Sequence, residues 1–586
     1  MQIRKAIMPE RISTGSAFAW AIVPWLLACG AEPRSAEGTG EGRLAEADSA
    51  MQRAMADTLA WPSYGRDYTN RRFSRLSQIN TGNVKELRQA WKYNTGLPYS
   101  FENSPIVVGN TMYISTPLNQ VLALDARTGQ RQWQYVHEHN TTVHCCGAVN
   151  RGVAVYDDRV YMGALDARLI ALDAASGKKL WDVQVADNER GYALNGPVVA
   201  IDGKVITGVS GAEYGIRGFI AAHDARTGKE VWRWYVVPSP EEGGWWGQWR
   251  EKDAFGVSLN RNIAREKADS AKYADAWQTG GGSVWQAPAI DTERGSVIFT
   301  VGNPSPDLDG SVRPGDNLWT NSIIALDYRT GEFRWGYQQI PHDVWDLDTA
   351  SPVVLVEVDS GGRRIPAVAQ AGKHGWVDIV HRETGKPIRR SKNFVPHDNV
   401  YALPTREGTR MLPGANGGSE WSPTAVHPEL NLMYVLALHQ PMLYKVRSEP
   451  LKPPAMWLGG AFVGTGEPQY GLFSAVNLNT GDIAWQNKVE KPMIGGALAT
   501  AGGLVFTGLG EQRFVAYDAK SGRQLWSVET RGGVNAPPVT YSIDGTQYVA
   551  VAAGGNFQIN TPRSDELLVF ALGGRATGGQ RQQGGQ

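Results

Sequence analysis

The chain has few cysteines, a formal net charge of zero and only short hydrophobic runs. Its 586 residues contain only three cysteines, which excludes a disulfide-dense scaffold, and no His or Cys cluster has the spacing of a zinc site. Lys plus Arg and Asp plus Glu both number 58, and no basic run stands out, so nothing favours nucleic-acid binding. The apolar stretch 16–28 has 13 residues, too few to span about 30 Å of hydrocarbon.

That apolar stretch instead predicts export. Basic residues precede it, and "LLAC" ends it at Cys29 in a pattern that resembles a bacterial lipobox. We expect 1–29 to be a lipoprotein-type signal peptide, with a plain signal peptide as the alternative. The Ala-, Glu- and Gly-rich segment 30–57 predicts a flexible tether, and 573–586 a disordered tail. The protein is therefore expected in the periplasm, in contact with a membrane only through a lipid anchor.

The other two cysteines, Cys145 and Cys146, are adjacent in "HCCGAVNRG". Exported proteins keep disulfides, so these two could pair with each other or stay reduced. Adjacent Cα atoms lie about 3.8 Å apart, below the usual disulfide range of about 4.4 to 6.8 Å. A bond between neighbours also closes almost no chain and gives little loop-entropy stabilisation. The pair therefore indicates a functional site rather than a structural staple.

Tryptophan, in contrast, is abundant, with 21 copies, and six of them end a recurring pattern such as "ALDARTGQRQW". Each copy has an alternating apolar strand, a tight turn with Gly four residues before the Trp, and a second strand. Two weaker copies, around Trp91 and in "DIVHRETGKPI", bring the number to about eight. Units of roughly 40 to 50 residues with several strands are typical of propeller blades. We predict an all-β fold, an eight-bladed β-propeller with tryptophan-docking repeats over 58–572, in which the repeat tryptophans Trp133, Trp181, Trp232, Trp335, Trp485 and Trp526 pack between blades.

Two stretches interrupt the repeat, at 238–284 and 440–472. Long insertions on a rigid scaffold usually build a site or cover one.

Acidic and amide residues outside the repeat follow predicted strands. Glu213 lies in "SGAEYGIRG", Asn303 in "VGNPSPD", and Asp343, Asp346 and Asp348 in "PHDVWDLD". Oxygen ligands from separate strands suit a hard cation such as calcium. Taken singly, each acid would more often cap a turn or a helix.

Together these segments resemble the pyrroloquinoline quinone (PQQ)-dependent alcohol dehydrogenases of the eight-bladed propeller class. The resemblance covers about residues 58 to 572. It is carried by the Trp repeats and by "CCGAVNRG", "SGAEYGIRG", "GGGSVW", "GNPSPD", "RPGDNLWTNSIIALD" and "PHDVWDLD", in order and spacing.

The resemblance implies a cofactor site. Cys145 and Cys146 would form a vicinal disulfide against one face of PQQ, and Trp285 would stack on the other face. Planar partners on both sides hold a flat cofactor without a covalent bond. The polar groups of PQQ would be contacted by Glu102, Arg151, Ser210, Gly211, Ala212 and Lys373.

The resemblance also implies a metal ion beside the quinone, either Ca²⁺ or a lanthanide. Glu213 and Asn303 match metal ligands, and Asp346 matches the catalytic acid, which would also touch the metal. Asp348, two residues further on, resembles the additional acid of lanthanide-dependent relatives. Three carboxylates around one ion repel one another, and a trivalent ion offsets that repulsion better than a divalent one.

The chain departs from the family pattern at three places. Asn195 lies nearest to the position of a usual Thr, Glu420 in "GGSEWSP" replaces a usual Asn, and Ile494 stands where a Trp is common before "GGALATAGG". These changes affect the rim of the site, so the substrate class is less firmly implied than the cofactor.

The leading hypothesis is a periplasmic enzyme that oxidises an alcohol to an aldehyde or ketone. Because the sequence has no CxxCH motif, electrons are expected to pass to an external acceptor such as a c-type cytochrome. One alternative is a PQQ-dependent sugar (glucose-type) dehydrogenase, whose "WDxD" stretch resembles "WDLD". Another, of a different class, is a non-catalytic propeller scaffold lipoprotein.

Overall fold

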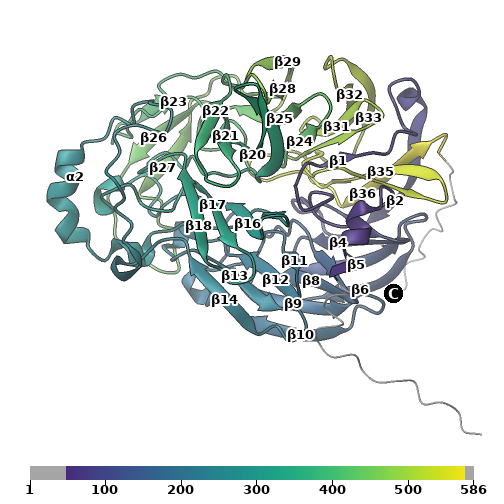
Figure 1. Ribbon diagram of the computed structural model, residues 1–586, viewed down its shortest axis with the longest axis horizontal. Coiled ribbons are helices and arrows are strands. Elements are labelled where there is room, and N and C mark those ends of the chain that lie inside the picture. Colours follow the sequence, from purple (N-terminus) through teal and green to yellow (C-terminus); the bar gives the residue numbers. More distant parts are fainter. Residues whose placement is uncertain (1–47, 50, 575–586) are drawn as a thin grey trace, which may run out of the picture. The chain divides into compact units, whose positions relative to one another are not determined.

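The computed structural model describes residues 48–49 and 51–574. The predicted signal peptide with Cys29, the first part of the predicted tether and the tail from residue 575 lie outside the described residues. Within them, strands dominate and form nine sheets, eight of which have four or five strands (Figure 1). No helix of this part of the chain combines the length and apolarity that crossing a membrane requires.

Four sheets follow one another along the first half of the chain, each built from consecutive antiparallel strands. They contain β3 (Ile106–Val108), β4 (Thr111–Thr116), β5 (Gln120–Asp125) and β6 (Arg131–Val136); β7 (Ala154–Tyr156), β8 (Arg159–Gly163), β9 (Arg168–Asp173) and β10 (Lys179–Gln184); β11 (Val199–Ile201), β12 (Lys204–Gly208), β13 (Phe219–Asp224) and β14 (Glu230–Tyr235); and β15 (Ala289–Asp291), β16 (Ser296–Thr300), β17 (Ser322–Asp327) and β18 (Phe333–Gln338).

Three more sheets of the same kind follow. They contain β19 (Val354–Ser360), β20 (Arg363–Ala371), β21 (Val377–His381) and β22 (Pro387–Arg390); β24 (Ala425–His427), β25 (Leu432–His439), β28 (Tyr470–Asn477) and β29 (Ile483–Val489); and β30 (Ala497–Thr500), β31 (Leu504–Leu509), β32 (Arg513–Asp518) and β33 (Gln524–Glu529), with β1 (Phe73–Ser74) added in parallel to β30.

The eighth sheet joins the two ends of the domain. The C-terminal strands β34 (Val539–Ile543), β35 (Thr546–Ala553) and β36 (Glu566–Leu572) are completed by β2 (Leu87–Asn94), which pairs antiparallel with β36. Figure 1 shows β2 beside β36. This pairing closes the succession of sheets, and the all-β propeller class predicted from the repeats is confirmed.

Tryptophan docking connects one sheet to the next, as the repeat predicts. The Trp133 indole donates a 3.0 Å hydrogen bond to the carbonyl of Ala174, and a Cβ atom on Gly177 would lie 2.5 Å from the Trp133 ring. The turn glycine therefore makes room for the Trp of the preceding unit, except at Gly481, because the unit before it has no Trp. Equivalent indole bonds are made by Trp181, Trp232, Trp335, Trp485 and Trp526, and also by Trp91 of the weaker copy.

The two interruptions of the repeat are largely irregular. Residues 238–284 contain α2 (Ile263–Asp269) and the short 3₁₀ helices η4 (Pro240–Glu242), η5 (Ser270–Tyr273) and η6 (Ala276–Thr279). Residues 440–472 contribute β26 (Met442–Val446) and β27 (Gly460–Gly464). In the ninth sheet, β26 pairs with β27 on one side and with β23 (Thr409–Met411) on the other. The other 3₁₀ helices are η1 (Val84–Glu86), η2 (Asn188–Arg190), η3 (Ala212–Tyr214) and η7 (Gly310–Val312).

The described end of the predicted tether is not an extended linker. Residues 51–56 are helical, and Met51 is buried in a hydrophobic cluster. The Asp48 carboxylate accepts hydrogen bonds of 2.7 Å from the Tyr156 hydroxyl and 2.8 Å from the Asp202 amide. The folded domain therefore begins before residue 58, because this segment offers apolar side chains that dock on the propeller.

Candidate active site

A cavity that opens to solvent lies where segments from most of the sheets converge, and its empty space, counted together with the solvent at its mouth, is about 550 Å³. Its walls hold ten of the predicted site residues together with six others. The predicted ones are Cys145, Cys146, Arg151, Ser210, Gly211, Glu213, Trp285, Asp346, Asp348 and Lys373, and the others are Asn195, Ser283, Asn416, Glu420, Trp421 and Gln558.

The adjacent cysteines form a disulfide bond in the loop between β6 and β7, as the resemblance implied. A ligand oxygen of Glu213 lies within 4.8 Å of both sulfur atoms. Because both sulfur atoms are in the disulfide, they are not thiolate metal ligands. Cys145 is buried and Cys146 is exposed, and both cysteines line the cavity.

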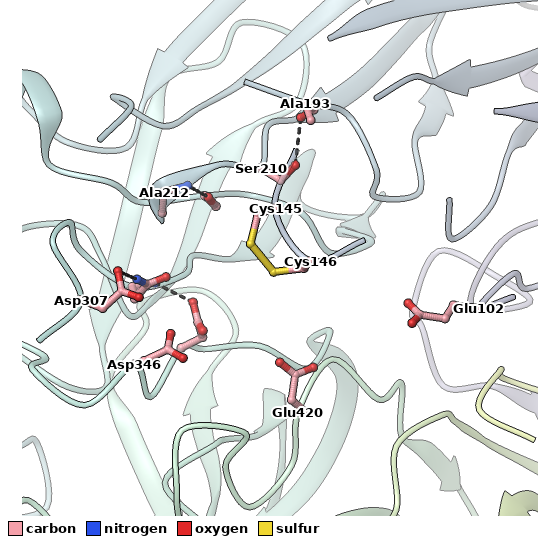
Figure 2. The surroundings of a disulfide bond; sticks show 12 residues. Glu102, Cys145, Cys146, Ala193, Ser210, Ala212, Asp307, Asp346 and Glu420 are labelled. Carbon is pink, nitrogen blue, oxygen red and sulfur yellow. Dashed lines mark hydrogen bonds between the residues drawn. A yellow bond between two sulfur atoms is a disulfide. The ribbon is translucent and has the colours of Figure 1, made fainter. Parts of the chain in front are cut away.

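Backbone geometry fixes the strand end that carries Ser210 and Glu213. The Ser210 amide and hydroxyl both donate to the Ala193 carbonyl, at 2.9 and 3.1 Å. Gly211 follows with φ 117°, and a Cβ atom there would lie 2.0 Å from the Gly191 carbonyl oxygen, so only glycine fits. Figure 2 shows Ser210 on one side of the disulfide and the carboxylates of Asp346 and Glu420 on the other.

Arg151 stands between two aromatic rings at the cavity wall. Its guanidinium carbon lies 5.2 Å from the Trp285 ring centroid and 4.8 Å from that of Trp421. Its Nη2 forms a 3.0 Å ion pair with Glu102, which also accepts a 2.7 Å hydrogen bond from the Asn556 amide. Glu102 does not line the cavity, so it acts on the site through Arg151.

Three of the predicted site residues therefore lie behind the wall rather than in it. Besides Glu102, these are Ala212, whose amide donates 2.9 Å to the Ser283 hydroxyl, and Asn303. The Asn303 side-chain nitrogen donates to the Asp307 carboxylate at 2.9 Å and to the Pro304 carbonyl at 3.1 Å. Both hydrogens of that nitrogen are used, which leaves Oδ1 as the atom that could bind a cation.

Asp346 occupies an unusual backbone position, with φ 56° in the left-handed region. The Asp343 carboxylate accepts 2.9 Å hydrogen bonds from the amides of Trp345 and Leu347, on either side of Asp346. Non-glycine residues in this conformation are costly and are retained where the surroundings fix them. The turn therefore holds the Asp346 carboxylate in place at the cavity.

Lys373 lies among the carboxylates that face it. Its Nζ is 2.6 Å from Asp348, 3.4 Å from Asp346 and 3.8 Å from Glu420. Asp348 also accepts a 2.7 Å hydrogen bond from the Asn303 amide through its other oxygen. Asp348 thus links the Asn303 turn to Lys373.

The charges of the cavity favour a cation. Four carboxylates and two cationic side chains line it, a formal charge of 2 − 4 = −2. Burial, with the charge of Asp348 nearby, raises the pKa of Glu213 to about 7. Burial also raises the pKa of Asp346 well above its ordinary value. Buried carboxylates that outnumber the positive charges beside them provide oxygen donors that a hard cation would neutralise.

The predicted metal ligands do not form a closed shell as they stand. Among the described residues, the oxygens of Glu213, Asp346 and Asp348 do not all come within 4.8 Å of one another. Lys373 instead engages Asp346 and Asp348. The site offers the right donors for a metal ion, with the lysine as their present counter-charge.

The cavity also fits a flat, polar cofactor. Asn195 Oδ1, Arg151 Nε and Trp421 Nε1 are buried atoms of cavity residues, and none of them has a hydrogen-bond partner among residues 48–49 and 51–574. Unpaired buried donors and acceptors around one cavity indicate a ligand that would pair with them. Trp421, Asn416, Gln558 and Ser283 are not among the predicted site residues: Ser283 and Trp421 lie in quoted family segments but are assigned no role there, and Asn416 and Gln558 lie outside those segments.

Comparisons with known proteins show the family of the chain. The family model described as "PQQ: Glucose/ethanol/alcohol dehydrogenase, beta-propeller domain" matches residues 61–400 and 453–549. The quinohemoprotein alcohol dehydrogenase of Comamonas testosteroni is 36% identical, over 88% of this chain and 76% of that protein. The quinoprotein alcohol dehydrogenase PedH of Pseudomonas putida is 33% identical, over 82% of this chain and 84% of that protein.

Solved structures give the same result. The crystal structure of the Comamonas testosteroni enzyme superposes with a TM-score of 0.78 at 33% identity, covering 93% of this chain and 86% of that one. A europium-containing methanol dehydrogenase superposes with a TM-score of 0.79 at 29% identity, covering 89% of this chain and all of that one. The fold and the site define a propeller dehydrogenase that uses a quinone cofactor. The chain belongs to the family of PQQ-dependent quinoprotein alcohol dehydrogenases.

Proposed function

We propose that this protein is a periplasmic dehydrogenase that uses PQQ and a metal ion, Ca²⁺ or a lanthanide, to oxidise an alcohol to an aldehyde or ketone. The observation that carries the proposal is the single cavity that brings together the Cys145–Cys146 disulfide, Trp285, Arg151, Lys373 and Asp346. This combination serves cofactor binding and proton removal together, and a scaffold protein would not need it.

The residues of the chain divide the work as follows. The disulfide and Trp285 would hold the planar cofactor, and Arg151 and Lys373 its polar groups. Glu213, Asn303, Asp346 and Asp348 would hold the metal ion. When bound, PQQ supplies the two-electron acceptor and the metal supplies Lewis acidity.

Asp346 would remove the proton from the alcohol hydroxyl. The 343–347 turn holds its carboxylate at the cavity, and general-base catalysis requires that placement. A nearby metal ion would favour the ionised carboxylate, because opposite charge lowers the pKa that burial raises.

Location and electron transfer follow from the sequence. The export signal 1–29 and a disulfide that needs an oxidising compartment support a periplasmic protein, anchored by lipid at Cys29. With no CxxCH motif in its sequence, the enzyme would pass electrons to an external acceptor such as a c-type cytochrome.

A substrate panel tests the proposal. Metal-free protein is reconstituted with PQQ and either Ca²⁺ or La³⁺, and dye-linked oxidation of primary alcohols, secondary alcohols and aldoses is compared. We expect kcat/KM for at least one alcohol to exceed that for every aldose. Preference for an aldose would support the sugar dehydrogenase alternative, and no oxidation of any substrate by the PQQ-loaded protein would support the scaffold alternative.

A further inference from the structure

One buried guanidinium lies between the turn that carries Asn303 and the turn that carries Asp346. It belongs to Arg313, in the "RPGDN" motif, and none of its side chain is exposed. It donates from Nε to the Pro306 carbonyl at 2.8 Å, from Nη1 to Asn317 Oδ1 at 2.7 Å, and from Nη2 to the carbonyls of Asp307 (3.0 Å) and Asp343. Three of its four acceptors are therefore main-chain atoms of the two turns.

On one side, Arg313 fixes the segment that orients Asn303. The carbonyls of Pro306 and Asp307 follow Asn303 by three and four residues, and the Asp307 carboxylate accepts the 2.9 Å hydrogen bond from the Asn303 side chain. This bond directs the Asn303 nitrogen towards Asp307 and leaves its oxygen for a cation. A shift of Asp307 would therefore rotate or displace the Asn303 amide.

On the other side, Arg313 fixes the start of the turn that carries Asp346. It binds the carbonyl of Asp343, whose carboxylate holds the amides of Trp345 and Leu347. Asn321 adds a 3.0 Å hydrogen bond to the same carboxylate. The position of Asp346 thus depends on Asp343, and that of Asp343 on Arg313.

Ion pairing does not explain the burial of this charge. Among the described residues, no carboxylate forms an ion pair with the Arg313 guanidinium within 4.0 Å. Several acidic side chains nevertheless lie in the neighbourhood of Arg313. A buried charge satisfied by carbonyl oxygens stabilises little by itself, and apolar side chains could fill the space. The planar fork of arginine, in contrast, can hold several carbonyls at fixed relative positions, and lysine cannot.

We propose that Arg313 is a positioning residue that holds the metal ligand Asn303 and the catalytic base Asp346 at fixed positions relative to each other. It touches neither the cofactor cavity nor the metal donors directly. The inference rests on the proposed function, because it explains why two groups that act in that function are held at a fixed spacing. Residues behind the ligands of a metal site typically change metal affinity or activity by about 10- to 100-fold when they are replaced.

Arg313→Lys tests the proposal, since it keeps the charge and removes the fork. We expect the affinity for La³⁺ or Ca²⁺, measured by titration calorimetry on the metal-free, PQQ-loaded protein, to fall at least about tenfold. We expect kcat to fall by a similar factor while KM for the alcohol stays within about twofold, because Arg313 does not contact the substrate cavity.

Arg72→Lys is the matched control. Arg72 is also wholly buried, and it donates to the carbonyls of Tyr64, Ala497 and Pro538, away from both turns. Its replacement should lower the melting temperature while leaving metal affinity and kcat close to those of the wild type.

The outcomes separate the inference from the proposed function. Wild-type metal affinity and kcat in folded Arg313→Lys would overturn the inference alone, as would equal losses in Arg72→Lys. Failure of the wild-type protein to bind metal and PQQ would overturn the proposed function. If Arg313→Lys does not fold, Asn321→Ala, which removes a support of the Asp343 carboxylate, takes its place. Unchanged kcat and metal affinity in that variant would then contradict the proposal.

Discussion

The Lys373 ammonium donates a 2.6 Å hydrogen bond to the Asp348 carboxylate. Burial alone would lower the pKa of Lys373, but Asp346, Asp348 and Glu420 outweigh it and raise the pKa well above its ordinary value. The charged form of Lys373 is therefore favoured, which makes it a poor candidate for the base. In the proposed mechanism, one of the cavity carboxylates would remove the proton of the substrate.

Asp346→Asn should abolish most turnover. The substitution keeps the size of the side chain and removes the base, which typically contributes about 10²- to 10⁴-fold to the rate. We expect kcat to fall by about three orders of magnitude, with PQQ still bound, in stopped-flow or dye-linked assays. Turnover near that of the wild type would assign the base to another carboxylate, Asp343 or Asp348.

The Cys145–Cys146 disulfide should be present in the exported protein. Alkylation without reduction, followed by mass spectrometry of the peptide that spans both residues, should show no label. The replacement of both cysteines by serine should weaken PQQ binding, because the rigid wall beside the cofactor is lost. Two labels in freshly purified, active protein would show that the bond is not needed.

Asp348 should determine the choice of metal. With Glu213 and Asp346 it would place three carboxylates at the ion, which favours a trivalent cation. We expect higher activity with La³⁺ than with Ca²⁺, and we expect Asp348→Ala to reduce the affinity for La³⁺ by at least about tenfold. Glu420→Gln is the control: it removes a cavity carboxylate outside the predicted ligand set and should preserve the ratio of La³⁺ to Ca²⁺ affinity. Full activity of the wild type with Ca²⁺, unaffected by Asp348→Ala, would exclude this role.

Glu213 should make the stability of the metal-free protein depend on pH. Its pKa is about 7 in the folded chain because of burial, whereas an unfolded glutamate titrates near 4.3. The folded state therefore holds a proton that the unfolded state has lost, and stability due to this group falls as pH rises from about 4.3 to 7. Relative to the wild type, Glu213→Gln should become more stable across this window in calorimetric melts.

Metal should reverse that difference. A cation that binds the ionised Glu213 stabilises the folded wild type and not the glutamine variant. Above pH 7, La³⁺ or Ca²⁺ should therefore raise the melting temperature of the wild type more than that of Glu213→Gln. Equal responses of the two proteins would remove Glu213 from the ligand set.

Much of the fold follows from local sequence. The turn glycine of each repeat and the Trp four residues later predict docking between sheets. Five of the six repeat tryptophans meet the turn glycine of the following unit, as Trp133 meets Gly177. The docking of Asp48 and Met51 was not foreseen, because a short Ala- and Glu-rich segment has no periodic pattern strong enough to distinguish a docked helix from a linker.

The candidate site is less completely predictable. Motifs place Cys145, Glu213 and Asp346 at one cavity, but they do not distinguish residues that line it from residues behind it. Glu102 proves to act through Arg151, and Arg313 holds the two turns through main-chain carbonyls. Contacts of this kind depend on where separate loops meet in space, which spacing along the chain does not show.

The most direct test is an anaerobic single-turnover experiment. Protein loaded with PQQ and La³⁺ or Ca²⁺, freed of excess cofactor, is mixed with a primary alcohol while the absorption spectrum is recorded. We expect conversion of the bound quinone to its reduced form, with release of about one equivalent of aldehyde per chain and no conversion in Asp346→Asn on the same timescale. Retention of PQQ with no spectral change for any alcohol, or no retention of PQQ at all, would contradict it.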